Sequence, residues 1–102
     1  MVFFITMAYC YILHSNSLNR YYTGSTVLSP EERLKRHQEK YYGTKKFTAK
    51  ANDWKIFFVI ECISIEQAKR IESHIKRMKS KKYIENLVKF PQITQRLLEK
   101  YK

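Results

Sequence analysis

The spacing of apolar and polar residues along the chain predicts three β-strands. Residues 8–13 and 20–23 are rich in β-forming side chains, and the small polar residues 15–19 between them favour a turn, so these two strands form a hairpin. Gly24 is expected to end the second strand. Residues 54–62 form a continuous apolar run, which is typical of a third and well-buried strand.

The register of the hairpin decides which side chains meet across it. We pair Leu13 with Arg20, which brings Tyr11 opposite Tyr22 on one face of the sheet. Tyrosines on strands are most often half-buried core residues, so residue type alone favours a structural role for both. A functional role therefore needs further signals.

A strong helix start follows the hairpin. Ser29 is placed as the N-cap, Pro30 as the first helical residue, and Glu32 completes a capping box, so we expect a helix from Pro30 to about Lys40. Residues 41–53 contain a glycine, lysines and small polar residues without periodicity, which predicts a basic loop.

Three more helices are expected after the third strand. Ser64 caps the first, Ser80 starts the second, and Pro91 separates the second from a short amphipathic helix. The side chains expected to face inward in the last two are Tyr83, Ile84, Leu87 and Val88, then Ile93, Leu97, Leu98 and Tyr101. This order predicts an α/β (α+β) layer fold, in which helices flank a small three-stranded antiparallel or mixed sheet and an extra helix ends the chain.

A chain of 102 residues can bury a single modest core, so we expect one domain over residues 1–102. The apolar opening is too short for a membrane span and lacks the basic segment and cleavage pattern of a signal peptide. Met7 is an equally good start, since the strand signal begins after it. We therefore expect residues 1–7 to be an N-terminal extension, with residues 1–6 dispensable, and residues 91–102 to be the C-terminal helix.

The composition favours a folded protein with a polyanionic partner. Hydrophobic residues make up 44% of the chain, which excludes a disordered protein, and a formal net charge of +11 should attract nucleic acid. An anionic membrane surface is the competing partner, although the basic residues do not line one long amphipathic helix. Cys10 and Cys62 lie in apolar runs without the paired spacing of a zinc site, so we expect reduced core thiols in an intracellular, cytoplasmic protein.

Glu72 lies within the apolar stripe of the helix that Ser64 caps. On a helical wheel the stripe consists of Ile65, Ala68, Ile71, Ile75 and Met78, and the opposite, polar face of Glu66, Lys69, Arg70, Ser73 and Arg77. A carboxylate turned toward a core costs several kcal/mol unless it is paired, hydrogen-bonded or bound to a metal. From the helix alone, a structural ion pair and a metal site both remain open.

The helix that starts at Pro30 has few residues for core packing. Leu34 is its one aliphatic side chain, while Arg33 and His37 stand one turn apart on a shared face. A solvated basic helix explains this pattern equally well, so Arg33 and His37 are candidates only in combination with other signals.

Four short motifs together resemble the GIY-YIG nuclease family, over residues 9 to about 87. In the first two, Tyr11 takes the place of the tyrosine of the family's first triplet, whose glycine is absent, and Tyr22-Thr23-Gly24 matches the second with threonine in place of isoleucine. The other two are Arg33-Leu34-Lys35-Arg36-His37, of the form R-L-x-x-H, and the segment with the acidic residue Glu72 that runs on into Ile75-Lys76-Arg77-Met78-Lys79-Ser80. The sequence is most similar to small single-domain members and to the nuclease half of bacterial excision-repair endonucleases.

The resemblance implies a divalent-metal-dependent DNA endonuclease, with DNA repair or structure-specific cleavage as its setting. Glu72 would hold one Mg²⁺ or Mn²⁺ ion, Arg33 would neutralise charge on the scissile phosphate, Tyr22 or Tyr11 would orient or deprotonate the attacking water, and His37 would assist. A catalytically inactive nucleic-acid-binding domain on the same fold is the main alternative. A basic membrane-surface or protein-interaction module is the third.

Basic residues in two segments are expected to grip the DNA backbone with little sequence preference, because lysine contacts phosphates and reads no bases. These residues are Lys45, Lys46, Lys50, Lys76, Arg77, Lys79, Lys81 and Lys82. For any one of them, a simple solvated surface position remains the alternative.

Overall fold

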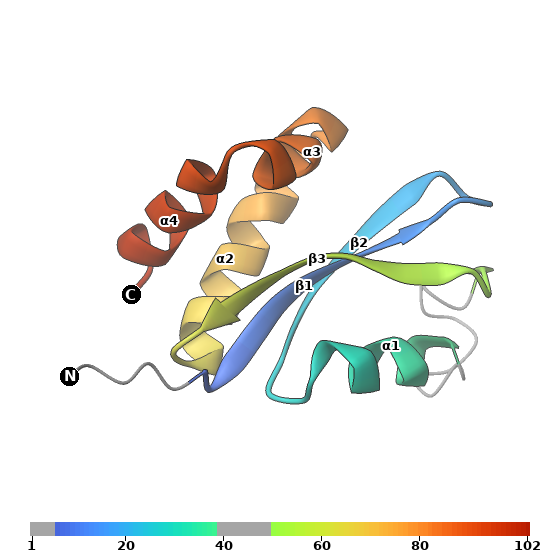
Figure 1. Cartoon of the computed structure of the whole chain (residues 1–102), viewed down its shortest axis with the longest axis horizontal. Coiled ribbons are helices and arrows are strands. Elements are labelled where there is room, and N and C mark those ends of the chain that lie inside the picture. The colour runs from blue at the N-terminus through green and yellow to red at the C-terminus, as the bar shows by residue number, and fades with distance from the viewer. Residues whose placement is uncertain (1–5, 39–49) are drawn as a thin grey trace.

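The computed structural model describes residues 6–38 and 50–102. These two ranges contain three strands and four helices in the predicted order (Figure 1). Their bounds are β1 Ala8–Ser15, β2 Arg20–Thr26, α1 Pro30–Gln38, β3 Trp54–Cys62, α2 Ile65–Met78, α3 Lys81–Lys89 and α4 Pro91–Lys100. The three strands form one antiparallel sheet, which confirms the α+β prediction.

Helices cover both faces of this sheet. α1 packs on one face and α2 on the other, while α3 and α4 pack against α2 on its outer side (Figure 1). β1 lies between β2 and β3, and α1 and α2 pack over its two faces, so most of its residues are buried. The core therefore has two parts, one around Cys10, Ile12 and Ile71 toward α2, and a smaller one around Tyr11 and Trp54 toward α1.

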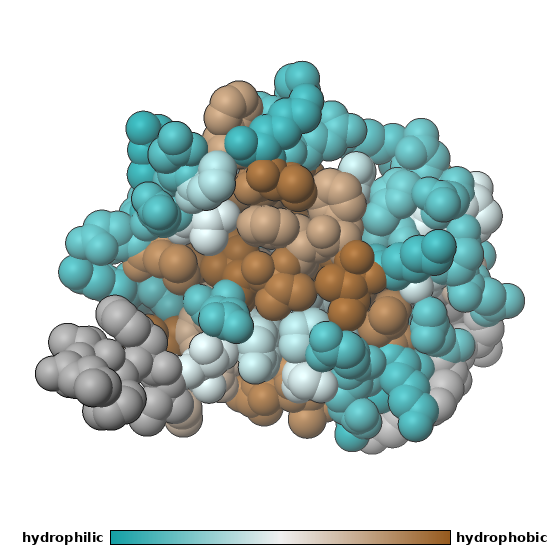
Figure 2. Space-filling model, viewed as in Figure 1, coloured by the Kyte–Doolittle hydropathy of each residue, from teal (hydrophilic) through white to brown (hydrophobic). Residues whose placement is uncertain are grey.

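A bulge in β3 adds an aromatic side chain to the larger core. Ile12 pairs with Phe58 and Leu13 with Ile56, so Phe57 has no partner on β1, and Phe57 and Phe58 both pack toward α2. Figure 2 shows hydrophobic side chains gathered in the middle of one face of the molecule, with polar side chains around them.

The predicted hairpin register is wrong by two residues. Leu13 pairs with Tyr22, and Arg20 pairs with Ser15, because β1 continues two residues beyond its predicted end and residues 16–19 form a tighter turn. A shift of two residues keeps every side chain on its predicted face. Tyr11 and Tyr22 therefore still share a face, as diagonal neighbours.

The predicted end of the second strand at Gly24 is also wrong. β2 continues to Thr26, and Gly24 pairs directly with Tyr11. A Cβ atom at Gly24 would lie 2.5 Å from the ring carbon Cζ of Tyr11, which is closer than packed atoms approach. The glycine therefore makes room for the phenol ring of its partner.

The predicted helix starts are confirmed. The hydroxyls of Ser29, Ser64 and Ser80 accept hydrogen bonds from the backbone N–H groups three residues on, and α4 begins at Pro91. The predicted end of α1 near Lys40 lies outside the described residues.

Two of the apolar residues expected to face inward are exposed. Val88 is 50% exposed, because α3 contacts the core through Ile84 and Leu87 and Val88 lies beyond the edge of that contact. Met78, the last member of the α2 stripe, is 45% exposed in the final turn of that helix.

Both cysteines are free and buried, as predicted. Burial raises the pKa of both thiols, that of Cys62 to about 11, so they remain protonated at neutral pH. The described helices are all too short and too polar to cross a membrane.

Candidate active site

The hydroxyl group of Tyr11 lies at the centre of a buried polar cluster between β1 and α1. Arg33 donates to this oxygen through Nε at 3.3 Å and through Nη2 at 3.2 Å, and His37 Nε2 lies 3.0 Å away. Tyr11 is fully buried and His37 is 3% exposed. The face that Arg33 and His37 share therefore packs onto the sheet, and the alternative of a solvated basic helix is wrong for these two residues.

His37 is held in its neutral form within this cluster. Burial, together with the neighbouring positive charge of Arg33, lowers the pKa of His37 to about 4, so the imidazole is neutral at neutral pH. Arg33 can only donate, so the Tyr11 oxygen accepts from it, while the direction of the bond between Tyr11 and His37 is set by the tautomer of the imidazole. Arg33, Tyr11 and His37 thus form a short chain of hydrogen bonds.

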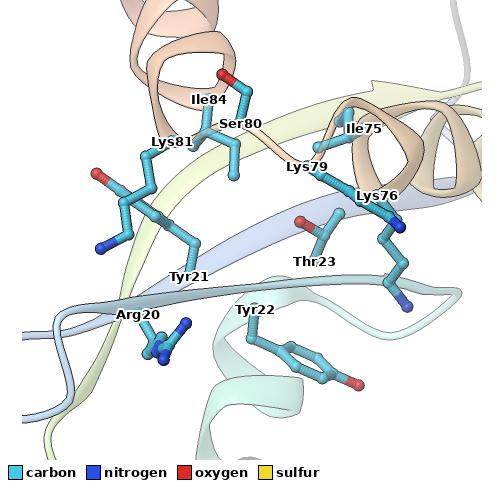
Figure 3. Close-up of a pocket in the computed structure, with 10 residues that line it drawn as sticks. All are labelled: Arg20, Tyr21, Tyr22, Thr23, Ile75, Lys76, Lys79, Ser80, Lys81 and Ile84. Carbon is cyan, nitrogen blue, oxygen red and sulfur yellow. The ribbon is translucent and has the colours of Figure 1, made fainter.

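Tyr22 lies beside this chain at the open edge of the sheet. Its ring centroid is 6.4 Å from that of Tyr11 and 5.1 Å from that of His37, and its ring is half-buried. Figure 3 shows Tyr22 on the opposite side of β2 from Thr23, with its hydroxyl directed away from the strand. Of the two tyrosines, Tyr22 is therefore the more exposed.

Glu72 connects to this cluster through a lysine. The Lys76 ammonium lies 2.6 Å from Glu72 Oε2, one helical turn away on α2, and 5.8 Å from the centroid of the Tyr22 ring. The Glu72 side chain is 19% exposed, so it lies at the edge of the apolar stripe and is not fully inside it as the wheel suggested. The ion pair that the sequence left open is present.

A groove of about 390 Å³ runs along β2 below the turn between α2 and α3 (Figure 3). The positive charges along it are those of Arg20, Lys76, Lys79 and Lys81. Lys81 also donates to the backbone oxygen of Asn19, which ties α3 to the hairpin turn. The groove is thus a concave basic surface adjoining Tyr22.

Only part of the predicted DNA-binding set lines this groove. Arg77 lies on the outer side of α2, 3.4 Å from the Tyr101 hydroxyl, and Lys82 and Lys50 are exposed elsewhere. Lys45 and Lys46 lie outside the described residues.

Arg20 lines the groove and was missed by the sequence reasoning. Strand alternation was the available signal, since residues two apart on a strand point to the same face and Arg20 precedes Tyr22 by two.

The donor set fits a hard divalent cation only in part. Among the described residues, no three His, Cys, Asp or Glu side chains are grouped as a metal cage would require. Glu72 is a single carboxylate, and Mg²⁺ is commonly bound through one or two carboxylates together with water and substrate phosphate oxygens. The residues present therefore suit a cation that is completed by a phosphate substrate.

Comparison with known proteins adds one finding. The sequence model of one protein family, described as the GIY-YIG catalytic domain, matches residues 7–84, which is most of the chain. No curated protein and no solved structure matches. Domains of this family are generally divalent-metal-dependent endonucleases, and a nuclease domain implies DNA as substrate. With the four motifs on the strands and helices described above, the match shows that this chain belongs to the GIY-YIG nuclease family.

Proposed function

We propose that this chain is an active, divalent-metal-dependent endonuclease that hydrolyses phosphodiester bonds in DNA. The observation that carries the proposal is the hydrogen-bonded chain of Arg33, Tyr11 and His37, together with the neighbouring Tyr22, which lines a basic groove. Placing the imidazole of His37 and the hydrogen bonds of Arg33 inside the protein costs free energy of desolvation. A domain that only binds DNA does not need this arrangement, because lysines on its surface can contact phosphates equally well.

Arg33 is proposed to stabilise negative charge on the scissile phosphate. Its guanidinium is held by two hydrogen bonds to one buried oxygen, which fixes its orientation before the substrate arrives. A planar guanidinium matches the geometry of phosphate oxygens. Preorganised positive charge of this kind lowers a barrier more than a mobile charge does.

The two tyrosines are proposed to have different roles. The Tyr11 hydroxyl accepts from Arg33 and is paired with His37 inside the protein, so Tyr11 positions these two residues and does not touch the substrate. Tyr22 is assigned the contact with the attacking water. The Lys76 ammonium lies 5.8 Å from the centroid of the Tyr22 ring.

Glu72 is proposed to hold one divalent cation, Mg²⁺ or Mn²⁺. When bound, such a cation supplies Lewis-acid stabilisation of the charge that develops on the phosphate and the leaving oxygen. Glu72 contributes a carboxylate from α2, one helical turn from Lys76, which lines the groove.

DNA is proposed to bind through its backbone along the groove. Among the described residues, those that line the groove include four basic side chains and no asparagine or glutamine for reading base edges, so little sequence preference is expected. Structure-specific cleavage, as in DNA repair, is the setting that we propose.

The test is cleavage by the purified protein, with Mg²⁺ or Mn²⁺, of single-stranded, duplex, flap and junction DNA. Arg33→Ala should lower cleavage by orders of magnitude. Arg36→Ala is the matched control, because it removes the same charge from α1 at a residue that pairs with Glu32 on the surface. DNA binding without cleavage by the wild-type protein would instead support the inactive binding domain.

A further inference from the structure

Glu72, the proposed metal ligand, forms an ion pair with Lys76 in the free protein. Lys76 Nζ lies 2.6 Å from Glu72 Oε2, and the two residues are one turn apart on the same helix. The Lys76 side chain is 53% exposed, so it is able to move, whereas Glu72 is 19% exposed. In the free protein, the more mobile partner of the pair is therefore the lysine.

Two cations compete for this carboxylate. An ammonium on one oxygen and a dication on the other would repel each other across the width of a single carboxylate. The hydrogen bond from Lys76 must also be given up, or weakened, when a metal draws electron density from Glu72. Metal binding to the free protein is therefore opposed by Lys76.

The groove offers the Lys76 side chain a second position, away from Glu72. It lines the groove together with Arg20, Lys79 and Lys81, and no carboxylate is among the described residues that line this surface (Figure 3). Within the described part of the chain, Arg20 and Lys79 form no ion pair. A phosphate in the groove would satisfy these charges and offer the Lys76 ammonium a partner other than Glu72.

We propose that Lys76 blocks the metal ligand Glu72 in the free protein and releases it when a DNA phosphate enters the groove. Binding of the divalent cation and binding of DNA then strengthen each other, because each favours the state in which Lys76 has left Glu72. The inference rests on the proposed function, since it takes Glu72 as the metal ligand. Its consequence is that the site is loaded with metal mainly when substrate is present.

The first test measures Mn²⁺ binding to the free protein, without DNA, from the electron paramagnetic resonance signal of unbound Mn²⁺. Lys76→Met and Lys76→Gln remove the ammonium. Lys79→Met is the matched control, because it removes the same charge from the same groove at an exposed residue that does not contact Glu72. Glu72→Gln tests the ligand itself, and circular dichroism melts check that each variant is folded.

Removing the Lys76 ammonium should tighten Mn²⁺ binding about tenfold or more, within the usual range of coupling between sites, and Lys79→Met should change it much less. Equal tightening in the two would show a general charge effect and overturn the blocking role. Unchanged or absent binding in both Lys76 variants would overturn it as well. If Glu72→Gln binds Mn²⁺ as the wild-type protein does, the failure lies instead in the metal assignment of the proposed function.

The second test measures the coupling directly. Short duplex DNA is added during the Mn²⁺ titration in the Arg33→Ala background, in which no cleavage is expected. DNA should tighten Mn²⁺ binding in this background, and adding Lys76→Met should remove most of that gain. A gain of equal size with and without Lys76 would contradict the proposed release, because the metal would then be recruited by the DNA alone.

Discussion

Replacing Tyr11 by phenylalanine removes one oxygen atom from the centre of the proposed site and leaves the ring in place. That oxygen accepts two hydrogen bonds from Arg33 and is paired with His37 Nε2 at 3.0 Å. Arg33 is partly exposed, so water can replace its lost hydrogen bonds, whereas His37 is 3% exposed and loses its hydrogen bond to Tyr11 at a buried position. An unpaired buried polar group costs about 1–3 kcal/mol, so Tyr11→Phe should lower the free energy of unfolding by that amount.

For a domain of this size, a loss of that order lowers the melting temperature by roughly 5–20 °C. Urea melts followed by circular dichroism at pH 7 measure the loss directly. Tyr21→Phe is the matched control, since its hydroxyl on the other face of the sheet makes no hydrogen bond within the described residues. The control should change stability by less than about 0.5 kcal/mol.

Tyr11→Phe should also slow cleavage, because Arg33 loses the acceptor that orients it. Misplacement of a charge by about 1 Å can cost on the order of 10²-fold in rate. If Tyr11→Phe melts at the same temperature as the wild-type protein and cuts DNA at the wild-type rate, the Tyr11 hydroxyl does not organise the site.

Four further outcomes are expected. Glu72→Gln should abolish Mg²⁺-dependent cleavage while shifting stability by only about 0–1 kcal/mol, because its partner lysine is half-exposed; a strongly destabilised variant that still cuts DNA would rule out the metal role. The pKa of His37 is lowered to about 4 from 6.5, so the unfolded chain binds more protons between these values. The free energy of unfolding should therefore fall as the pH drops through this window, by on the order of 3 kcal/mol, and His37→Gln should flatten this dependence in urea melts at several pH values. Deleting residues 1–6 should leave the thermal transition and the cleavage rate unchanged, and loss of the transition would place this segment in the core. DNA binding should weaken steeply with salt, with a log–log slope of several units in a filter-binding or anisotropy titration, and a flat response would argue against phosphate contacts.

Features set by local periodicity were predictable from the sequence. The three serine caps, the third strand and the class of the fold follow from turn chemistry and apolar spacing, and all are confirmed. The hairpin register was wrong, yet Tyr11 and Tyr22 were still assigned to one face, because an error of two residues preserves side-chain alternation. The shared face of Arg33 and His37 was likewise visible from their spacing on a helix.

Features set by contacts between elements were not predictable in this way. Gly24 resembles a strand end in sequence, and only its pairing with Tyr11 shows that it provides space for a ring. The partial exposure of Glu72 depends on where α2 crosses the sheet, and a helical wheel does not contain that information. The central role of the Tyr11 hydroxyl likewise depends on how α1 packs against β1.

The most direct test of the central claim is Mg²⁺-dependent cleavage of DNA under single-turnover conditions by the wild-type protein, Arg33→Ala and Arg36→Ala, with DNA binding measured on the same samples. The account predicts that all three bind DNA and that only Arg33→Ala loses cleavage, by orders of magnitude. Cleavage that survives in Arg33→Ala, or that is lost equally in Arg36→Ala, would contradict the claim that the Arg33, Tyr11 and His37 cluster forms the active site.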